Sequence, residues 1–299
     1  MHVFLTGGRG EVGGPILNAL IRAGHTVDAL ARSETAAADM VARGATAVRG
    51  NLQSPTTWVN SLRGADVVIH AAATFEDDEE AVDDIFVSAL IDGAQKRDRA
   101  LRVLYTGGCW LYGETGDEIA TETSPYAAPA AFQWAVRHSA RLHAVGADGG
   151  IEAITLHPAM VYGDGGGVFD RFAADARNNG RIQLWGSGKI RWPVVHRDDV
   201  GEAYRLAAER GVAGEHYNLS AESGLATGKI ADAIARRFGA TGLHEILPRE
   251  QALATHGIWA EGPMIDQQMS GTKARISLGW KPEWTNACAF IEDDMKFPA

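Results

Sequence analysis

The chain has 299 residues, of which 45% are hydrophobic, so it can bury one large core or two modest ones without disulfides or metals to hold it together. Its 28 basic residues are outnumbered by 38 acidic ones and form no cluster, which argues against nucleic acid or a membrane surface as a partner. Its two cysteines lack metal-ligand spacing and no stretch of 18 apolar residues occurs, so we expect a soluble, cytoplasmic protein without a metal site.

The first half of the sequence alternates short apolar runs with helical patterns, which is typical of successive βαβ units and a parallel sheet. The predicted strands are Val3–Leu5, Thr26–Ala31, Ala45–Val48, Asp66–His70, Leu101–Tyr105 and Ile151–Leu156. The predicted helices are Glu11–Ala23, Glu34–Arg43, Pro55–Leu62, Glu80–Lys96 and Ala130–Val145.

Two local signals mark helix starts in this region. Ser54 precedes Pro55, and serine caps free N–H groups while proline at the first helical position loses no hydrogen bond. The acidic stretch from Glu76 to Glu80 also begins a predicted helix, where the helix dipole favours carboxylates. We therefore interpret the acidic stretch as a solvated helix start rather than a metal site.

Beyond residue 163 the alternation loosens into glycine-rich loops. A strand at Trp192–Val195 and helices at about Asp199–Glu209 and Thr227–Phe238 are still predicted. The sequence thus predicts an α/β protein, with a Rossmann doubly wound parallel sheet and a small mixed C-terminal substrate lobe. We place the dinucleotide-binding domain at 1–163 with a returning segment at about 192–220, and the substrate lobe at 164–191 and 221–299.

A glycine-rich turn follows the first strand and begins the first helix. Gly7 allows the tight turn, Gly10 allows close approach of a pyrophosphate, and Gly13 allows the helix to pack on the strand. The strand–turn–helix context makes this a dinucleotide site. The neighbouring residues expected to contact the cofactor are Thr6, Arg9, Glu11 and Val12.

The end of the second strand predicts which dinucleotide binds. NAD-binding proteins usually place Asp or Glu there to hold the adenosine ribose, but this chain has Arg32 and Ser33. A guanidinium can pair with a 2′-phosphate and a serine hydroxyl can add a hydrogen bond. We therefore predict NADP (NADPH) as the cofactor.

With these residues in view, the chain resembles the extended short-chain dehydrogenase/reductases, a group that includes nucleotide-sugar epimerases, dehydratases and dihydroflavonol-type reductases. The resemblance covers nearly the whole length. It is carried by TGGRGEVG at 6–13, GNL at 50–52, HAAA at 70–73, YTGGCWLYG at 105–113, HPAMVYG at 157–163, VVHRDDV at 194–200, and KAR with LGWKP at 273–282.

The resemblance implies further contacts. Those expected for the cofactor are Asn51, Leu52, Ala71, Ala72, Ala73, Thr106, His138, Pro158 and Met160. Those expected for the substrate are Thr74, Gly108, Cys109, Trp110, Trp134, Arg191 and Trp192. The tryptophans would wall an apolar or aromatic substrate, and Arg191 would suit a carboxylate or phosphate.

The family's catalytic residues are replaced in this chain. Gly108 stands where the family has Ser or Thr, Trp134 where it has the proton-donating Tyr, and His138 where it has Lys. A slip of one residue gives Gln133 and Arg137 instead, and still no Tyr. An indole N–H cannot deliver its proton at neutral pH.

Three residues remain as catalytic candidates. Tyr112 is the surviving phenol, although the family mostly uses it structurally. His138 either holds ribose hydroxyls or lies on the helix surface, and Trp134 lies at the place of the acid. We interpret Cys109 as a packing residue, since nothing in the sequence indicates a depressed thiol pKa.

These features support three hypotheses for function. The first is an NADP-dependent oxidoreductase of a small aromatic or apolar carbonyl or activated alkene with a non-standard proton donor. The second is a non-catalytic NADP(H)-binding redox sensor or regulatory protein, and the third a sugar-nucleotide epimerase or dehydratase. The expected partner is a small-molecule substrate, with a possible homodimer formed through the helix at 80–96 and the helix that contains Trp134.

Overall fold

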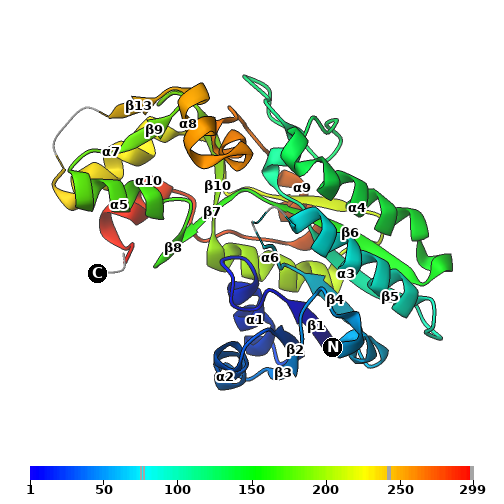
Figure 1. The fold of residues 1–299 in the computed structure, drawn as a ribbon. Helices are drawn as coiled ribbons and strands as arrows, with labels where there is room; N and C mark the ends of the chain where they lie inside the picture. Colours follow the sequence, from blue (N-terminus) through cyan, green and yellow to red (C-terminus); the bar gives the residue numbers. More distant parts are fainter. Residues whose placement is uncertain (75, 77, 241–243, 297–299) are drawn as a thin grey trace.

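The computed structural model describes residues 1–74, 76, 78–240 and 244–296, and it has a large parallel sheet covered by helices on both faces (Figure 1). The sheet has seven strands in the order β11-β6-β5-β4-β1-β2-β3, all parallel. The strands are β1 (His2–Thr6), β2 (Thr26–Ala31), β3 (Thr46–Arg49), β4 (Val67–His70), β5 (Leu101–Thr106), β6 (Ile151–Pro158) and β11 (His216–Leu219).

Each face of this sheet has its own apolar core because successive side chains of a strand point to opposite faces. In β1, Val3 and Leu5 pack on the face of helices α1 (Gly13–Arg22), α2 (Glu34–Ala42) and α6 (Arg197–Arg210). Phe4 packs on the other face, with α3 (Glu79–Ala94) and α4 (Gln133–Val145). The predicted Rossmann α/β class is confirmed.

Between β3 and β4 the predicted helix at 55–62 is wrong. The chain forms two 3-10 turns, η1 (Pro55–Thr57) and η2 (Val59–Arg63), interrupted at Trp58. Trp58 is fully buried between the rings of Phe4 and Phe86, and this packing overrides the local helix signal. The Ser54 side chain caps nothing here; instead the Thr57 hydroxyl donates to the Ser54 carbonyl.

A second lobe follows β6 and carries a small mixed sheet. Its strands run β12-β10-β7-β8, and a parallel pair β13-β9 lies beside them. The strands are β7 (Met160–Gly163), β8 (Gly166–Gly167), β9 (Gln183–Trp185), β10 (Arg191–His196), β12 (Glu222–Ala226) and β13 (Glu245–Leu247). The helices are α5 (Asp170–Asn179), α7 (Thr227–Phe238), α8 (Arg249–His256), α9 (Thr272–Leu278) and α10 (Ala287–Asp293).

Short 3-10 segments complete the chain: η3 (Cys109–Tyr112), η4 (Ala130–Phe132), η5 (Ala147–Gly149) and η6 (Ile258–Met264). The predicted returning segment divides between the two sheets, since β10 pairs with β7 in the small sheet and β11 pairs with β6 in the large one. The domain boundaries given above stay a prediction. Among the described residues, no helix is both long and apolar enough to cross a membrane.

Candidate cofactor and substrate site

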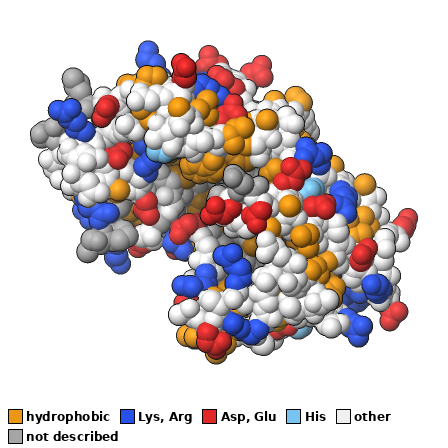
Figure 2. Space-filling view, viewed as in Figure 1, with side chains coloured by type: hydrophobic (Ala, Val, Ile, Leu, Met, Phe, Trp, Pro, Cys, Tyr) orange, Lys and Arg blue, Asp and Glu red, His pale blue; other side chains and the backbone are white. Residues whose placement is uncertain are grey.

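A cavity of about 1070 Å³ lies at the carboxyl ends of the large sheet's strands and reaches the second lobe. Figure 2 shows the molecule hollowed between the two lobes. Open α/β sheets bind ligands at this edge because the loops that leave the strands meet there. Most of the predicted contact residues line this cavity: Thr6, Gly7, Arg9, Gly10, Glu11, Val12, Arg32, Ser33, Asn51, Leu52, Ala71, Ala72, Ala73, Thr74, Thr106, Gly108, Cys109, Trp110, Trp134, Pro158 and Met160.

The glycine loop forms one wall of the cavity and its shape depends on two glycines. Gly7 has φ of +77°, and a Cβ there would lie 2.3 Å from the Ala71 carbonyl oxygen. A Cβ on Gly13 would lie 2.2 Å from the Gly7 carbonyl oxygen, so Gly13 packs against its own loop. The loop can therefore present its backbone N–H groups to a pyrophosphate.

Sequence reasoning missed one residue that supports this loop from behind. Arg43, which ends α2, donates to the backbone carbonyls of Gly8 and Gly14 and to the side chain of Asn18. No motif signal marks Arg43, because the contact joins the second helix to the loop before the first. It fixes the loop in the conformation that faces the cavity.

The adenosine end of the cavity is cationic. Arg32 is exposed at the end of β2, and within the described part of the chain no hydrogen bond or ion pair occupies its guanidinium. Arg9 is also exposed, with its Nε 3.7 Å from the Asp39 carboxylate. The Ser33 hydroxyl oxygen accepts from the backbone N–H of Ala36 at 3.1 Å, so Ser33 caps α2. A phosphate here would face both arginines and the start of that helix.

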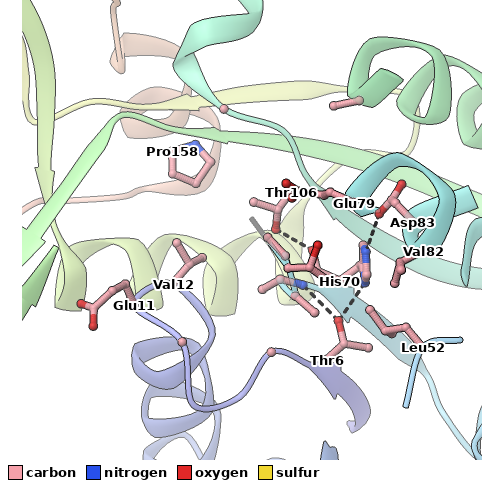
Figure 3. Close-up of a pocket in the computed structure, with 18 of the residues that line it drawn as sticks. Thr6, Glu11, Val12, Leu52, His70, Glu79, Val82, Asp83, Thr106 and Pro158 are labelled. Atoms are coloured by element: carbon pink, nitrogen blue, oxygen red, sulfur yellow. Dashed lines mark hydrogen bonds and ion pairs between the residues drawn. The ribbon is translucent and has the colours of Figure 1, made fainter. Parts of the chain in front are cut away.

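At the wall of the cavity, the largely buried carboxylate of Asp83 joins three side chains. Asp83 of α3 contacts His70 Nε2 at 2.7 Å, His138 Nδ1 at 2.6 Å and the Tyr105 hydroxyl at 2.8 Å. Burial alone would raise the pKa of Asp83, but the hydrogen bonds from His138, His70 and Tyr105 hold it well below its usual range. Figure 3 shows His70 between Asp83 and Thr6, whose hydroxyl lies 2.8 Å from His70 Nδ1.

This cluster contradicts both predictions for His138, namely that it holds ribose hydroxyls or that it lies on the helix surface. The residue is 6% exposed, so it is not a surface histidine. Its Nδ1 is bound to Asp83, and its ring does not line the cavity, so it does not replace the family's Lys at the cofactor ribose. No motif in the sequence marks Asp83, whose partners come from three other elements.

Tyr112 is likewise removed from the candidate proton donors. Its ring is buried outside the cavity and its hydroxyl donates to Asn218 at 2.7 Å. Burial raises the pKa of this phenol well above its usual range. Cys109 does line the cavity, but burial raises the pKa of its thiol to about 12, which agrees with a packing role.

Two predicted substrate residues belong to the protein interior instead. Trp192 is 4% exposed, stacks on Phe172, and donates its indole N–H to the Pro263 carbonyl at 2.9 Å. Arg191 is bound to the Asp266 carboxylate at 2.6 and 2.9 Å and to Asp117 at 2.9 Å. With both carboxylates on its guanidinium and no place in the cavity lining, Arg191 is not the anion-binding residue that we expected.

The end of the cavity away from Arg32 is built from uncharged and aromatic side chains. Trp110 contacts the ring of Phe132, with centroids 4.9 Å apart, and the ring of Trp259 at 5.7 Å. Trp134 lines the same wall. Sequence reasoning missed Phe132 and Trp259, since only the tertiary fold brings η4 and η6 to η3. At Gly108 a Cβ would meet no atom within 4 Å, so nothing fills the place of the family's Ser or Thr hydroxyl.

Comparison with known proteins agrees with this geometry. A model of the NAD dependent epimerase/dehydratase family matches residues 3–220. The 4-hydroxy-2-methyl-3-oxo-4-farnesyl-3,4-dihydroquinoline-1-oxide ketoreductase of Stigmatella aurantiaca is 31% identical over 220 residues, covering 71% of this chain and 65% of that protein. The decarboxylating sterol-4-alpha-carboxylate 3-dehydrogenase of Dictyostelium discoideum is 29% identical over 225 residues, covering 70% of this chain and 68% of that protein.

Among solved structures, the UDP-glucose 4-epimerase of Thermus thermophilus in complex with NAD superposes with a TM-score of 0.81 at 22% identity, covering 98% of each chain. That likeness shows the shared fold. The family match spans more than half of the chain, and the resemblance seen in the sequence is confirmed. The chain is therefore an extended short-chain dehydrogenase/reductase, an oxidoreductase that belongs to the NAD dependent epimerase/dehydratase family.

Proposed function

We propose that the protein is an NADP-dependent oxidoreductase of a small, apolar or aromatic carbonyl or activated alkene. The observation that carries the choice of NADP is Arg32, whose side chain lines the adenosine end of the cavity without a carboxylate partner among the described residues. Where NAD enzymes hold the ribose with a carboxylate, this chain thus has the guanidinium of Arg32, which is unpaired in the described part of the chain. A guanidinium facing a 2′-phosphate makes charge-assisted bonds that the NAD ribose cannot replace.

The aromatic end of the cavity supports the proposed substrate class. Trp110, Phe132 and Trp134 offer apolar surface and indole N–H groups, and the Arg191 side chain is already paired with two carboxylates. The relatives named above are a sterol dehydrogenase and a ketoreductase of a farnesylated quinoline. Both names describe oxidation or reduction on a largely apolar skeleton. A sugar-nucleotide substrate, our third hypothesis, has a diphosphate that this end does not match.

The proton in such a reaction needs a source other than the usual Tyr. The bound nicotinamide would supply a hydride to the carbonyl carbon. The indole N–H of Trp134 can hold the carbonyl oxygen by a hydrogen bond but cannot give up its proton. His70 contacts Asp83 and Thr6 through its two ring nitrogens, and Cys109 is too weak an acid. We infer that water entering the cavity delivers the proton.

The same absences support a second candidate, a non-catalytic NADP(H)-binding sensor. Neither a Tyr nor a Lys lies at the family's catalytic positions, which hold Trp134 and His138. A sensor would bind NADPH as tightly as an enzyme but would turn over no carbonyl.

We further propose a cytoplasmic homodimer that pairs through α3 and α4, which pack side by side and leave Ile85 38% exposed. One chain has a mass of 31.9 kDa. Light scattering that gives this mass for the protein in solution would contradict the dimer.

The cofactor assignment is tested by titrating NADPH and NADH against tryptophan fluorescence. We expect NADPH to bind at least about tenfold more tightly, since two charge-assisted bonds are each worth about 1.5–3 kcal/mol. Arg32→Asp should reverse the preference. Arg63→Asp is the matched control, because it makes the same charge change at an exposed residue of η2. Equal or tighter binding of NADH to the unmodified protein would refute the assignment.

Activity is tested with NADPH and a panel of aldehydes, ketones and activated alkenes. Oxidation of NADPH with any aromatic or apolar member supports the enzyme. Tight NADPH binding with no turnover across the panel would favour the sensor.

A further inference from the structure

We propose that the substrate carries an extended apolar tail, and that Trp259 and Ile258 of η6 hold this tail at the mouth of the cavity. The proposal rests on the function proposed above. It names the part of the substrate that the aromatic end of the cavity wall recognises. Both residues lie beyond the region matched by the family model, which ends at residue 220. They lie in the C-terminal lobe, in η6.

The first observation is a continuous apolar wall from the cavity interior to the surface. It begins at buried Cys109 and passes to Trp110, which is half-buried. Trp110 contacts the Trp259 ring edge-to-face at 5.7 Å. Trp259 lines the cavity and is 40% exposed, and Ile258 next to it is 60% exposed. Figure 2 shows apolar side chains gathered along the upper edge of the hollow, over the region that follows α8.

The second observation is that this apolar rim is held firmly in place. The Trp192 indole N–H of β10 donates to the Pro263 carbonyl and so ties η6 to the small sheet, and Glu261 pairs with Arg249 at 2.6 Å. Gly262 lies flat against the indole of Trp110, where a Cβ would come within 2.6 Å of the ring. A large aromatic side chain that is fixed yet partly exposed beside a cavity is typical of a binding surface rather than of a core.

The third observation concerns charge. The lining residues that come from η3, η4, α4 and η6 are Cys109, Trp110, Leu111, Phe132, Trp134, Ala135 and Trp259, and none of them is charged. The charged lining residues of the described chain come from the glycine loop, the end of β2, and α3 with the residues just before it. A phosphorylated or carboxylated tail would therefore find no partner along the wall, whereas a hydrocarbon tail would bury surface on it.

Chain-length dependence tests this inference. The probes are the methyl ketones from 2-butanone to 2-decanone, with NADPH as the reductant. Burial of each methylene is worth about 0.8 kcal/mol, so kcat/KM of the unmodified protein should rise by about three- to fourfold per added carbon until the tail passes Ile258. Trp259→Ala and Ile258→Ser should flatten this rise, with a larger loss for long ketones than for short ones. Ile276→Ser is the matched control, because Ile276 is 78% exposed on α9, away from the cavity lining.

A second readout does not depend on catalysis. Binding of 2-decanone to the complex with NADP is measured by tryptophan fluorescence, with 2-butanone as the reference. We expect tighter binding of the long ketone, and a loss of this difference in Ile258→Ser, which keeps every tryptophan. Length-dependent binding without turnover would support the tail site while overturning the proposed activity. Turnover with no dependence on chain length, or a dependence that both variants leave unchanged, would overturn the tail site alone.

Discussion

Single residues in this protein act mainly through their partners, and Asp83 is the clearest case. Its carboxylate, at the wall of the cavity, holds His70, Tyr105 and His138 in fixed orientations. A buried ion of this kind persists only when hydrogen bonds replace its lost hydration. This pairing affects the site, because His138, which we align with the family's Lys, is turned toward Asp83. The cofactor ribose must therefore be held by other groups of the cavity wall.

The role of the Trp134 indole can be tested by a single substitution. If the indole only walls the substrate, Trp134→Phe keeps an aromatic ring and loses one N–H donor, which costs about 1 kcal/mol. We expect kcat/KM for an aromatic aldehyde to stay within about fivefold of the unmodified protein. The measurement is NADPH oxidation at saturating cofactor. Collapse of the activity with NADPH binding intact would show instead that the indole N–H positions the substrate oxygen.

The reverse experiment restores the family's acid. Gly108→Ser, Trp134→Tyr and His138→Lys together should raise reduction of the same aldehyde on the order of a hundredfold, where the restored groups reach their usual geometry. The serine side chain has room, since nothing lies within 4 Å of a Cβ at Gly108. No gain in rate, with NADPH binding unchanged, would mean that the Asp83 cluster keeps the new lysine away from the cofactor.

At the scale of elements, the glycine loop depends on one close backbone contact, and the prediction is Gly13→Ala. The new methyl group would lie 2.2 Å from the Gly7 carbonyl oxygen, which belongs to the backbone and cannot move without reshaping the loop. We expect the Kd of NADPH to rise at least about tenfold, as one or two N–H contacts to the pyrophosphate are lost. Gly14→Ala is the matched control, because its methyl group would have no neighbour closer than 3.6 Å. Similar cofactor affinity in the two variants would contradict the role of this contact.

Helices and strands that follow an apolar periodicity in the sequence could be predicted. Those that depend on packing between residues distant in the sequence could not. The strands and helices of the first half follow the sequence pattern because each buries an apolar face. The turns around Trp58 do not, since Trp58 enters a core formed by residues far along the chain. Most of the predicted cofactor residues line the cavity because they lie at or just after the ends of parallel strands, and these ends meet at one edge of the sheet. Trp259 was not predictable, because η6 has no periodic pattern and meets Trp110 only in the fold.

For the whole molecule, buried histidines tie stability to pH. His157 is fully buried, and burial together with neighbouring His216 lowers its pKa to about 3. Burial also lowers the pKa of His216 to about 4. The two rings stack, and the Tyr126 hydroxyl lies 3.0 Å from one and 3.1 Å from the other. Asp199 opposes them, since burial raises its pKa to about 6 despite hydrogen bonds from the backbone of Glu283 and Trp284.

The direction of each pH effect depends on whether the folded or the unfolded chain binds more protons at the group. Between the folded values and the ordinary histidine pKa near 6.5, the unfolded chain binds more protons at both histidines, so stability is lost as the pH falls through this range. Asp199 acts in the opposite sense: its folded pKa is raised, so it costs stability as the pH rises from about 4 through 6. Taken alone, these two histidines and this one carboxylate give a net uptake of about one proton on unfolding near pH 5, which corresponds to about 1.4 kcal/mol of lost stability per pH unit.

This balance gives the prediction for the whole molecule, measured by urea unfolding at pH 7, 6, 5 and 4.5. The free energy of unfolding of the unmodified protein should fall below pH 6.5. His216→Asn keeps an acceptor for Tyr126 but removes one titrating group, so its slope near pH 5 should be shallower. Asp199→Asn removes the opposing group, so its slope should be steeper. A wild-type stability that stays flat from pH 7 to 4.5, or slopes that both variants leave unchanged, would show that these buried groups do not govern the acid sensitivity of the fold.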